Sequence, residues 1–104
     1  MRAIHLVRGV DTTRPALVLT RAHMLGRLTA ITAAPIASTV RGIPTEVPVD
    51  RRNGLDQESV VNRDNVMTIP AKDLGRHVGY FYDHQEPALA AALIAAYDLA
   101  AVPR

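Results

Sequence analysis

The chain of 104 residues has a mass of 11.3 kDa, 48% hydrophobic residues and a formal net charge of +2. This length allows one domain, so we expect residues 1–104 to form a single unit with one small core. The sequence has no cysteine, which excludes a disulfide scaffold, a thiol nucleophile and a cysteine zinc site, and favours a cytoplasmic protein. No apolar run reaches the roughly 18 residues of a membrane span and no signal peptide is recognised, so no membrane partner is expected.

The charges are divided unevenly along the chain. Residues 1–45 carry six arginines and one acid, whereas residues 46–104 carry six basic and nine acidic residues. Such a basic half favours an anionic partner, with nucleic acid as the leading candidate. GC-rich codon usage is another source of the eleven arginines and sixteen alanines, but it does not separate the two signs of charge.

Short apolar runs alternate with Gly, Pro, Asn and Asp along most of the chain. This spacing is typical of a small barrel or sandwich. Pro15 precedes the second run and fits a strand entrance, and Pro70 opens a short turn at 71–74. Strands are expected at 3–7, 16–20, 28–36, 46–49, 59–62, 66–69 and 77–82.

The hydrophobic period changes near the end of the chain, where residues 86–101 predict a helix. Glu86 and Pro87 suit its first turn. One face carries Leu89, Leu93, Tyr97 and Ala100, and Tyr97 is expected in the core. The opposite face is mostly alanine, which indicates either alanine richness alone or packing against a partner subunit.

Metal-dependent chemistry has weak support. The histidines form no i, i+4 pair and have no carboxylate at a ligand spacing, and they stand at positions 5, 23, 77 and 84. His5 and His77 alternate with apolar residues and are interpreted as surface positions, whereas His84 is the best candidate for proton transfer. No cofactor-binding glycine loop occurs, so neither a metal nor another cofactor is expected.

Arginine and hydroxyl groups remain as candidate catalytic groups. Arg14 follows Thr12 and Thr13 before the second expected strand, and Ser38 and Thr39 follow the third. A planar guanidinium matches two phosphate oxygens, and hydroxyl donors beside it would help to stabilise the charge of a phosphorane. From the residues alone, this is one hypothesis among several.

Four short segments carry a family resemblance. Residues 14–19 have the sequence Arg-Pro-Ala-Leu-Val-Leu, and 34–39 have Ala-Pro-Ile-Ala-Ser-Thr. Residues 43–47 have Ile-Pro-Thr-Glu-Val, and 64–69 have Asp-Asn-Val-Met-Thr-Ile. In this order the chain resembles the MazF/PemK toxins, and most closely their short actinobacterial branch. The resemblance covers nearly the whole chain.

This resemblance implies a mainly β, compact SH3-like barrel with a C-terminal helix, working as a homodimer. It also implies the toxin of a type II toxin-antitoxin system, a metal- and ribosome-independent endoribonuclease inhibited by a cognate, MazE-like antitoxin. The substrate would be single-stranded RNA, either mRNA or exposed loops of tRNA or rRNA. The ribose 2′-OH would attack the adjacent phosphate, giving 2′,3′-cyclic phosphate and 5′-OH ends.

By position, Arg14 matches the family's catalytic arginine, and its charge is expected to stabilise the phosphorane. The family's hydroxyl partner is a departure, because its threonine is replaced by Ala37 and the hydroxyl follows at Ser38. One step along a strand reverses the face of a side chain, so Ser38 can substitute only if the chain turns there. The alternatives are weaker catalysis or a hydroxyl from Thr39, Thr12 or Thr13.

The loop before Arg14 is shorter than in many family members, so base selection is expected to rest on other segments. The amide of Asn65 replaces the family's glutamine and is expected to read a base edge. Phosphate contacts fix register without reading sequence, and solvated arginines are the alternative interpretation. Phosphate contacts are expected from Arg8, Arg41 and Arg63, and RNA contacts from residues 21–27, Thr12, Thr13, Ile43, Asp64 and Asn65.

Two other functions remain open on the sequence. The CcdB toxins share the implied barrel and inhibit gyrase by binding it, although the Arg14-Pro15 segment favours the nuclease. A catalytically weakened RNA-binding module is the second alternative, because Ala37 replaces the threonine. That alternative predicts binding without cleavage, and cleavage restored by Ala37→Thr.

Overall fold

The computed structural model describes residues 1–9, 12–43 and 46–99, apart from the side chain of Asp64. Seven strands and one α-helix occur in this part of the chain. Their bounds are β1 (Arg2–Arg8), β2 (Thr13–Val18), β3 (Ala30–Ala37), β4 (Val47–Val49), β5 (Ser59–Val61), β6 (Met67–Pro70), β7 (Leu74–Phe81) and α1 (Glu86–Ala96).

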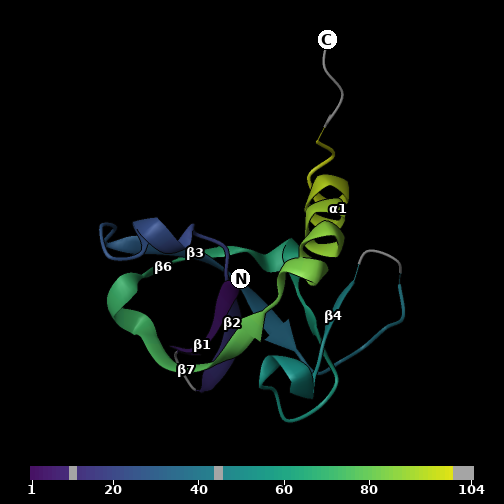
Figure 1. Ribbon diagram of the computed structural model, residues 1–104, viewed down its shortest axis with the longest axis horizontal. Coiled ribbons are helices and arrows are strands. Elements are labelled where there is room, and N and C mark those ends of the chain that lie inside the picture. Colours follow the sequence, from purple (N-terminus) through teal and green to yellow (C-terminus); the bar gives the residue numbers. More distant parts are fainter. Residues whose placement is uncertain (10–11, 44–45, 100–104) are drawn as a thin grey trace.

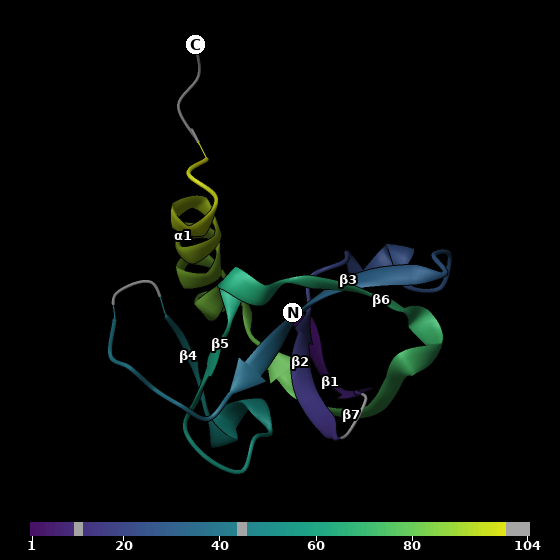
Figure 2. The ribbon, with the colours of Figure 1, turned by 180° about the vertical axis from the view of Figure 1, so that it is seen from behind.

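The strands pair antiparallel in the order β4-β5-β3-β2-β1-β7, and β6 also pairs with β3, on the edge opposite β2. The long strand β3 is shared, because residues 30–33 pair with β6, residues 33–35 with β2 and residues 36–37 with β5. The sheet therefore bends along β3, which Figure 2 shows crossing from one end of the molecule to the other. No pairing joins β4 to β7 within the described ranges, so the sheet curls into a half-barrel. The predicted mainly β fold is confirmed.

The second strand differs from its predicted position. It was expected at 16–20, with Pro15 at its entrance, but β2 spans Thr13–Val18 and contains Pro15. Pro15 lies opposite Leu6 of β1, whereas β2 pairs with β3 only from Ala16 onward. A proline, which has no backbone N–H to donate, is tolerated in this part of β2 because only one neighbouring strand is present.

The central strands are buried on both faces, which explains their continuous apolar runs. One cluster contains Ile4 and Leu17 on the face toward α1, and the other contains Val7 and Val18. Phe81, at the end of β7, is fully buried in the first cluster and connects it to the helix. Strands buried on both faces need apolar residues at every position rather than at alternate ones.

The helix is shorter than predicted, and its second half stands away from the sheet (Figure 1). Leu89 and Ala92 are buried against the core. The prediction that Tyr97 is a core residue is wrong, because the helix ends at Ala96 and Tyr97 is 51% exposed. Asp98 has a φ of 51°, so the chain turns away there, and residues 100–101 lie outside the described part. No helix in the described ranges is long and apolar enough to cross a membrane.

Candidate functional site

Arg14 and Ser38 come together at one end of the half-barrel. Ala16 of β2 pairs with Pro35 of β3, so the start of β2 lies beside the end of β3. Arg14 and Ser38 both line a pocket of about 320 Å³, which we call the Arg14 pocket. Its other lining residues are Leu6, Pro15, Ile36, Gly54, Leu55, Asp56, Gln57, Ser59, Arg76 and Val78.

The guanidinium of Arg14 is held by a local hydrogen bond. Its Nε donates to the hydroxyl of Thr12 at 3.1 Å, and both residues are exposed. The contact uses Nε alone, so the two terminal nitrogens of Arg14 are not part of it. A guanidinium oriented in this way can present its planar fork to a phosphate group.

The hydroxyl candidates that follow β3 are divided between two pockets. Ile36 and Ser38 line the Arg14 pocket, whereas Ala37 and Thr39 line another, of about 220 Å³. The two-residue period of β3 separates Ile36 from Ala37, the last residue of the strand, and the chain then bends at Ser38. Ser38 therefore lies on the Arg14 side, and Thr39 does not.

The second pocket, which we call the Thr39 pocket, gathers several predicted RNA-binding residues. Arg41, Ile43 and Arg63 line it together with Ala37, Thr39, Glu46, Val60 and Asn62. The carboxylate of Glu46 accepts hydrogen bonds from three backbone N–H groups, at residues 41–43. The bond from the Arg41 N–H is the main cause that holds the pKa of Glu46 below its usual value, and the N–H groups of Gly42 and Ile43 add to it.

Arg8 lies near Arg14, on the opposite side from Ser38. Arg8, Thr12 and Arg14 line a cavity of about 390 Å³, whose apolar side includes Met67 and Ile69. Thr13 is exposed and pairs with Arg8 across β1 and β2. The predicted phosphate contacts of Arg8 and the expected roles of Thr12 and Thr13 stay predictions, but all three residues lie at the Arg14 end of the sheet.

The remaining basic residues of the first half are not in one groove with Arg14. Residues 21–27 follow the far end of β2, and Arg27 is exposed before β3. Arg2, near the start of β1, donates to Glu86 at 2.9 Å and to the carbonyl of Leu19 at 2.7 Å. The asymmetry of charge along the sequence therefore does not translate into one basic surface.

Three predicted residues near position 64 belong to one short 3₁₀ turn, η3 (Arg63–Asn65), which contacts α1 and β3. Arg63 lines the Thr39 pocket, while Asn65 is exposed in the same turn. The side chain of Asp64 lies outside the described part of the structure. Base reading by Asp64 and Asn65 stays a prediction.

The Arg14 pocket also contains polar residues that were not predicted from the sequence. Arg76 of β7 lines the pocket together with Arg14, and Asp56 and Gln57 line it as well. The seventh strand was predicted to start at residue 77, whereas β7 begins at Leu74. An earlier strand start would have placed Arg76 and Val78 on one face by the two-residue period.

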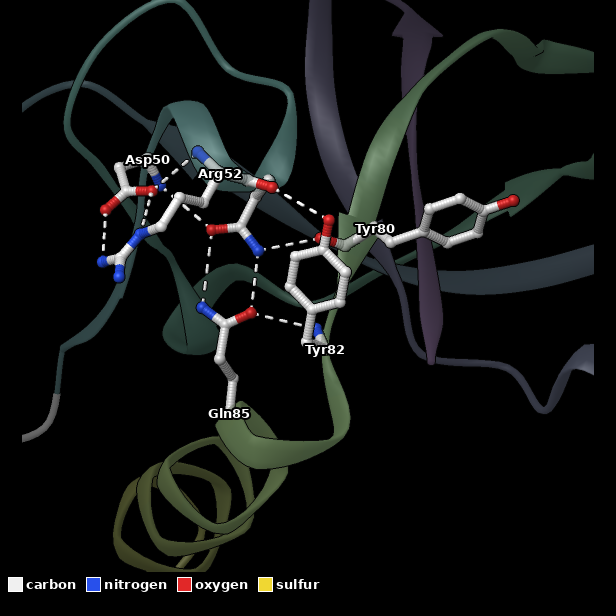
Figure 3. Close-up of polar contacts among 6 residues, drawn as sticks. Asp50, Arg52, Tyr80, Tyr82 and Gln85 are labelled. Atoms are coloured by element: carbon white, nitrogen blue, oxygen red, sulfur yellow. Dashed lines mark hydrogen bonds and ion pairs between the residues drawn. The ribbon is translucent and has the colours of Figure 1, made fainter.

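A buried amide cluster fixes the loop that carries Asp56 and Gln57 (Figure 3). Asn53 ends the 3₁₀ turn η2 (Arg51–Asn53) and is only 1% exposed. Its amide donates to the carbonyl of Tyr80 at 2.8 Å and to Oε1 of Gln85 at 2.7 Å, while its Oδ1 accepts from the Asp50 N–H at 3.1 Å. We call Asn53 and Gln85, with these backbone partners, the amide clamp. It ties the loop to the end of β7 and the start of α1.

Two glycines allow this loop to lie directly against β7. Gly54 has a φ of 91°, in the left-handed region that favours glycine. A Cβ at Gly54 would overlap the carbonyl oxygen of Val78, and one at Gly79 would overlap that of Asn53. The close backbone approach therefore sets one wall of the Arg14 pocket.

The histidines do not form a metal site. His5 Nδ1 lies 3.0 Å from the carbonyl oxygen of Gly75, and the rings of His5 and His77 are 5.2 Å apart. His84 stacks on Tyr82, with ring centroids 6.0 Å apart. Among the residues that the structure describes, no group of three or more His, Cys, Asp or Glu side chains could hold a metal ion.

Comparison with known proteins gives consistent similarities. The model of the PemK-like, MazF-like toxins of type II toxin-antitoxin systems matches residues 7–97. Endoribonuclease MazF3 of Mycobacterium tuberculosis (strain CDC 1551 / Oshkosh) is 56% identical over 99 residues, covering 95% of either chain. The solved Mycobacterium tuberculosis toxin MazF-mt6 is 55% identical with a TM-score of 0.89, covering 95% of this chain and 99% of its own. A mycobacterial endoribonuclease in complex with its cognate antitoxin shares the fold at 23% identity, with a TM-score of 0.82 and coverage of 97% and 95%.

Proposed function

Because this chain belongs to the PemK-like, MazF-like toxins of type II toxin-antitoxin systems, we propose that it cleaves single-stranded RNA at the Arg14 pocket. The chain is an endoribonuclease, and its substrate is mRNA or an exposed loop of tRNA or rRNA. The observation that supports this most is the placement of Arg14 and Ser38, from different strands, on one pocket.

The chemistry follows from what this pocket can supply. The ribose 2′-OH attacks the adjacent phosphate, and its tethering makes the step effectively intramolecular. Negative charge grows on the phosphorane oxygens, and the guanidinium of Arg14 stabilises it. Arg76 adds a second positive charge on the same pocket. The products are a 2′,3′-cyclic phosphate and a 5′-OH end, and no metal takes part in the reaction as proposed.

In this proposal the hydroxyl of Ser38 donates a hydrogen bond to the phosphorane and so helps Arg14 to stabilise its negative charge. Ser38 lines the Arg14 pocket, whereas Ala37 and Thr39 line the Thr39 pocket. A threonine at position 37 would place its hydroxyl on the Thr39 side, because neighbouring residues of an extended chain face opposite ways. The replacement of the family's threonine by Ala37 is therefore compatible with an active enzyme.

The wider biological setting belongs to the same proposal. The protein works as a homodimer of single-domain chains in the cytoplasm, and a cognate MazE-like antitoxin inhibits it. The family membership and a related endoribonuclease solved with its antitoxin support this assignment. The antitoxin would bring acidic or apolar side chains to the same end of the sheet and so exclude RNA.

The test is incubation of the purified protein with a defined RNA in the presence of EDTA. Cleavage with 5′-OH ends is expected, together with its loss in Arg14→Ala. Arg52→Ala is the matched control, because the side chain of Arg52 is 85% exposed and lines neither the Arg14 pocket nor the Thr39 pocket. This control variant is expected to cleave like the wild type.

Other results would contradict the proposal in different ways. Cleavage that requires added metal would exclude the mechanism. Binding of gyrase without RNA cleavage would favour a CcdB-like poison. RNA binding without cleavage, restored by Ala37→Thr, would indicate a weakened RNA-binding module.

A further inference from the structure

We propose that the backbone N–H groups of Arg41, Gly42 and Ile43 form a binding site for one phosphate group of the RNA, which Glu46 occupies in the unbound protein. The inference rests on the proposed function for the identity of the ligand. It adds a site formed by backbone groups, on the other side of β3 from Arg14, and an internal carboxylate that competes with the substrate.

The carboxylate of Glu46 is surrounded by backbone N–H donors. Oε1 of Glu46 accepts from the N–H groups of Gly42 at 2.7 Å, Arg41 at 3.1 Å and Ile43 at 3.2 Å. Oε2 accepts a further bond from the Arg41 N–H at 3.0 Å. Three successive backbone donors therefore converge on one charged group.

The local backbone makes this convergence possible. Gly42 has a φ of 74°, the left-handed conformation, which turns its N–H toward the same side as those of its neighbours. Successive N–H groups arranged in this way form a concave site for anions. The same bonds hold the pKa of Glu46 below its usual value, so the site favours negative charge over a neutral group.

The surroundings of the site match a phosphate better than a lone carboxylate. Thr39, which carries a hydroxyl, and Arg41 and Arg63, which carry guanidinium groups, line the same pocket. Phosphate accepts hydrogen bonds from all three kinds of donor. Ile43 is 41% exposed beside these donors and offers an apolar surface to the adjoining sugar or base.

The proposed site and the Arg14 pocket involve the same short stretch of chain. Ser38 lines the Arg14 pocket and the next residue, Thr39, lines the Thr39 pocket on the other side of the chain. Adjacent residues have Cα atoms about 3.8 Å apart. An RNA strand with one phosphate at Arg14 would therefore place another at residues 41–43 by crossing the chain just after β3.

Glu46 can leave the site without disturbing the core. Its side chain is only half-buried, and it belongs to the segment before β4 rather than to either core cluster. Displacement would move the carboxylate into water and pass three N–H donors to the phosphate. In the unbound protein the carboxylate satisfies these donors and lowers the apparent affinity for RNA.

The first test uses inorganic phosphate and does not depend on cleavage. The backbone amides of residues 41–43 are followed by NMR during a phosphate titration of the wild type, Glu46→Gln and Glu46→Ala. Saturable shifts of these amides are expected at lower phosphate concentration in both variants than in the wild type. Equal responses in the three proteins would overturn the proposal even if RNA cleavage were normal.

The second test uses an RNA that carries a 2′-deoxy nucleotide at the cleavage position and therefore stays intact. Glu46→Gln is expected to bind it about tenfold more tightly, because no carboxylate then competes with the phosphate for the three N–H groups. Glu58→Gln is the matched control, because it removes an exposed carboxylate outside the pocket and is expected to leave the affinity unchanged.

A further variant separates the amide site from the loss of charge alone. Gly42→Ala strains the left-handed backbone at the centre of the site, so Gly42→Ala with Glu46→Gln is expected to lose the gain in affinity. If the double variant binds as tightly as Glu46→Gln, simple charge repulsion explains the gain and the proposal fails. Complete absence of RNA binding would refute the proposed function, whereas phosphate shifts at residues 41–43 would still establish the anion site.

Discussion

The Arg14 pocket and the Thr39 pocket lie on opposite sides of the chain near the end of β3 and are stabilised in different ways. One wall of the Arg14 pocket is a loop held by the amide clamp, in which Asn53 is 1% exposed and Gly54 lies against the backbone of β7. The loop beside the Thr39 pocket is held by the carboxylate of Glu46, which solvent reaches. A buried amide therefore fixes one wall of the first pocket, whereas a half-buried carboxylate holds the loop beside the second.

This difference indicates that the Arg14 pocket stabilises the transition state and that the Thr39 pocket binds the substrate. Stabilisation of a transition state requires groups that are already in position, because reorganisation during the reaction adds to the barrier. Buried neutral amides with satisfied hydrogen bonds give that rigidity. A substrate contact that must open and close is better served by an exposed ion, whose displacement costs little. Substitutions in the Arg14 pocket should therefore change the cleavage rate, and those in the Thr39 pocket the affinity for RNA.

The largest effect is expected for Arg14→Ala, which removes the guanidinium from the rigid pocket. The cleavage rate should fall by about 10²–10³-fold, the range found when one donor to a developing oxyanion is lost. The affinity for a non-cleavable RNA should change much less than the rate. Single-turnover cleavage at saturating enzyme measures the first quantity and filter binding the second. An equal loss in both would make Arg14 a binding residue only.

The amide clamp is expected to carry the next largest effect, on the stability of the protein. Asn53→Ala should lower the free energy of unfolding by about 2–4 kcal/mol, because it removes the bonds of a buried amide to the Tyr80 carbonyl and to Oε1 of Gln85, and takes the acceptor from the Asp50 N–H. Urea unfolding followed by circular dichroism measures the change. Asn65→Ala is the matched control, since Asn65 is exposed and its loss should change stability by no more than about 0.5 kcal/mol.

A smaller effect should distinguish the two hydroxyls. Ser38→Ala removes a hydroxyl from the Arg14 pocket and should slow cleavage by about 10–100-fold. This loss is smaller than the one expected for Arg14→Ala, because a neutral hydroxyl stabilises the charged transition state less than a guanidinium does. Thr39→Ala removes one from the Thr39 pocket and should weaken RNA binding with the rate at saturation unchanged. The separation of maximal rate from affinity in the two variants is the measurement. The opposite assignment of effects would show that the pockets have exchanged roles.

The smallest effect is expected from acid, and it should act on the Thr39 pocket first. Hydrogen bonds from the N–H groups of residues 41–43 lower the pKa of Glu46 in the folded protein. Stability from a lowered carboxyl pKa is present above the unfolded value of 4.5 and is lost as the pH falls through the lower folded value. The amide protons of residues 41–43 should therefore lose protection from exchange below about pH 4.5, as measured by NMR.

The Asn53 side-chain amide in an Asp50→Asn variant is the internal control for this acid effect, because the Asp50 carboxylate caps the same turn and its pKa is lowered as well, chiefly by a hydrogen bond from Arg52. Because the Asn53 amide donates to neutral groups, its signals should persist over the same range of pH. Glu46→Gln should remove the pH dependence at residues 41–43. Simultaneous loss of both regions on acidification would show that the two pockets are not independently stabilised.

Much of the fold could be predicted from the sequence because strands and turns leave local patterns. The apolar runs located all seven described strands, and the positions of Gly and Pro marked the turns between them. The bounds of β2 and β7 were displaced because pairing with neighbouring strands, rather than local composition, decides where a strand starts. Tyr97 was placed in the core by helical spacing, but α1 ends one residue before it.

The identity of the candidate catalytic arginine also came from the chain itself. Arg14 stands in a segment whose order of residues resembles the family, and the match of residues 7–97 to the family model agrees with it. The basic half of the sequence pointed to an anionic partner. This charge pattern did not reveal that Arg2 is paired with Glu86 or that residues 21–27 follow the opposite end of β2. The order of charges along a sequence does not specify where their side chains lie in the fold.

Only the tertiary structure decided which residues meet. The side of β3 on which Ser38 and Thr39 lie depends on register, and the approach of Arg76 depends on how β7 is positioned by β1. The convergence of residues 41–43 on Glu46 depends on one left-handed glycine. The sequence thus determined the elements and the chemistry that they carry, since both are properties of local residues. Long-range pairing assigned that chemistry to two pockets on opposite sides of the chain after β3, one with a wall held by a buried amide and one beside a half-buried carboxylate.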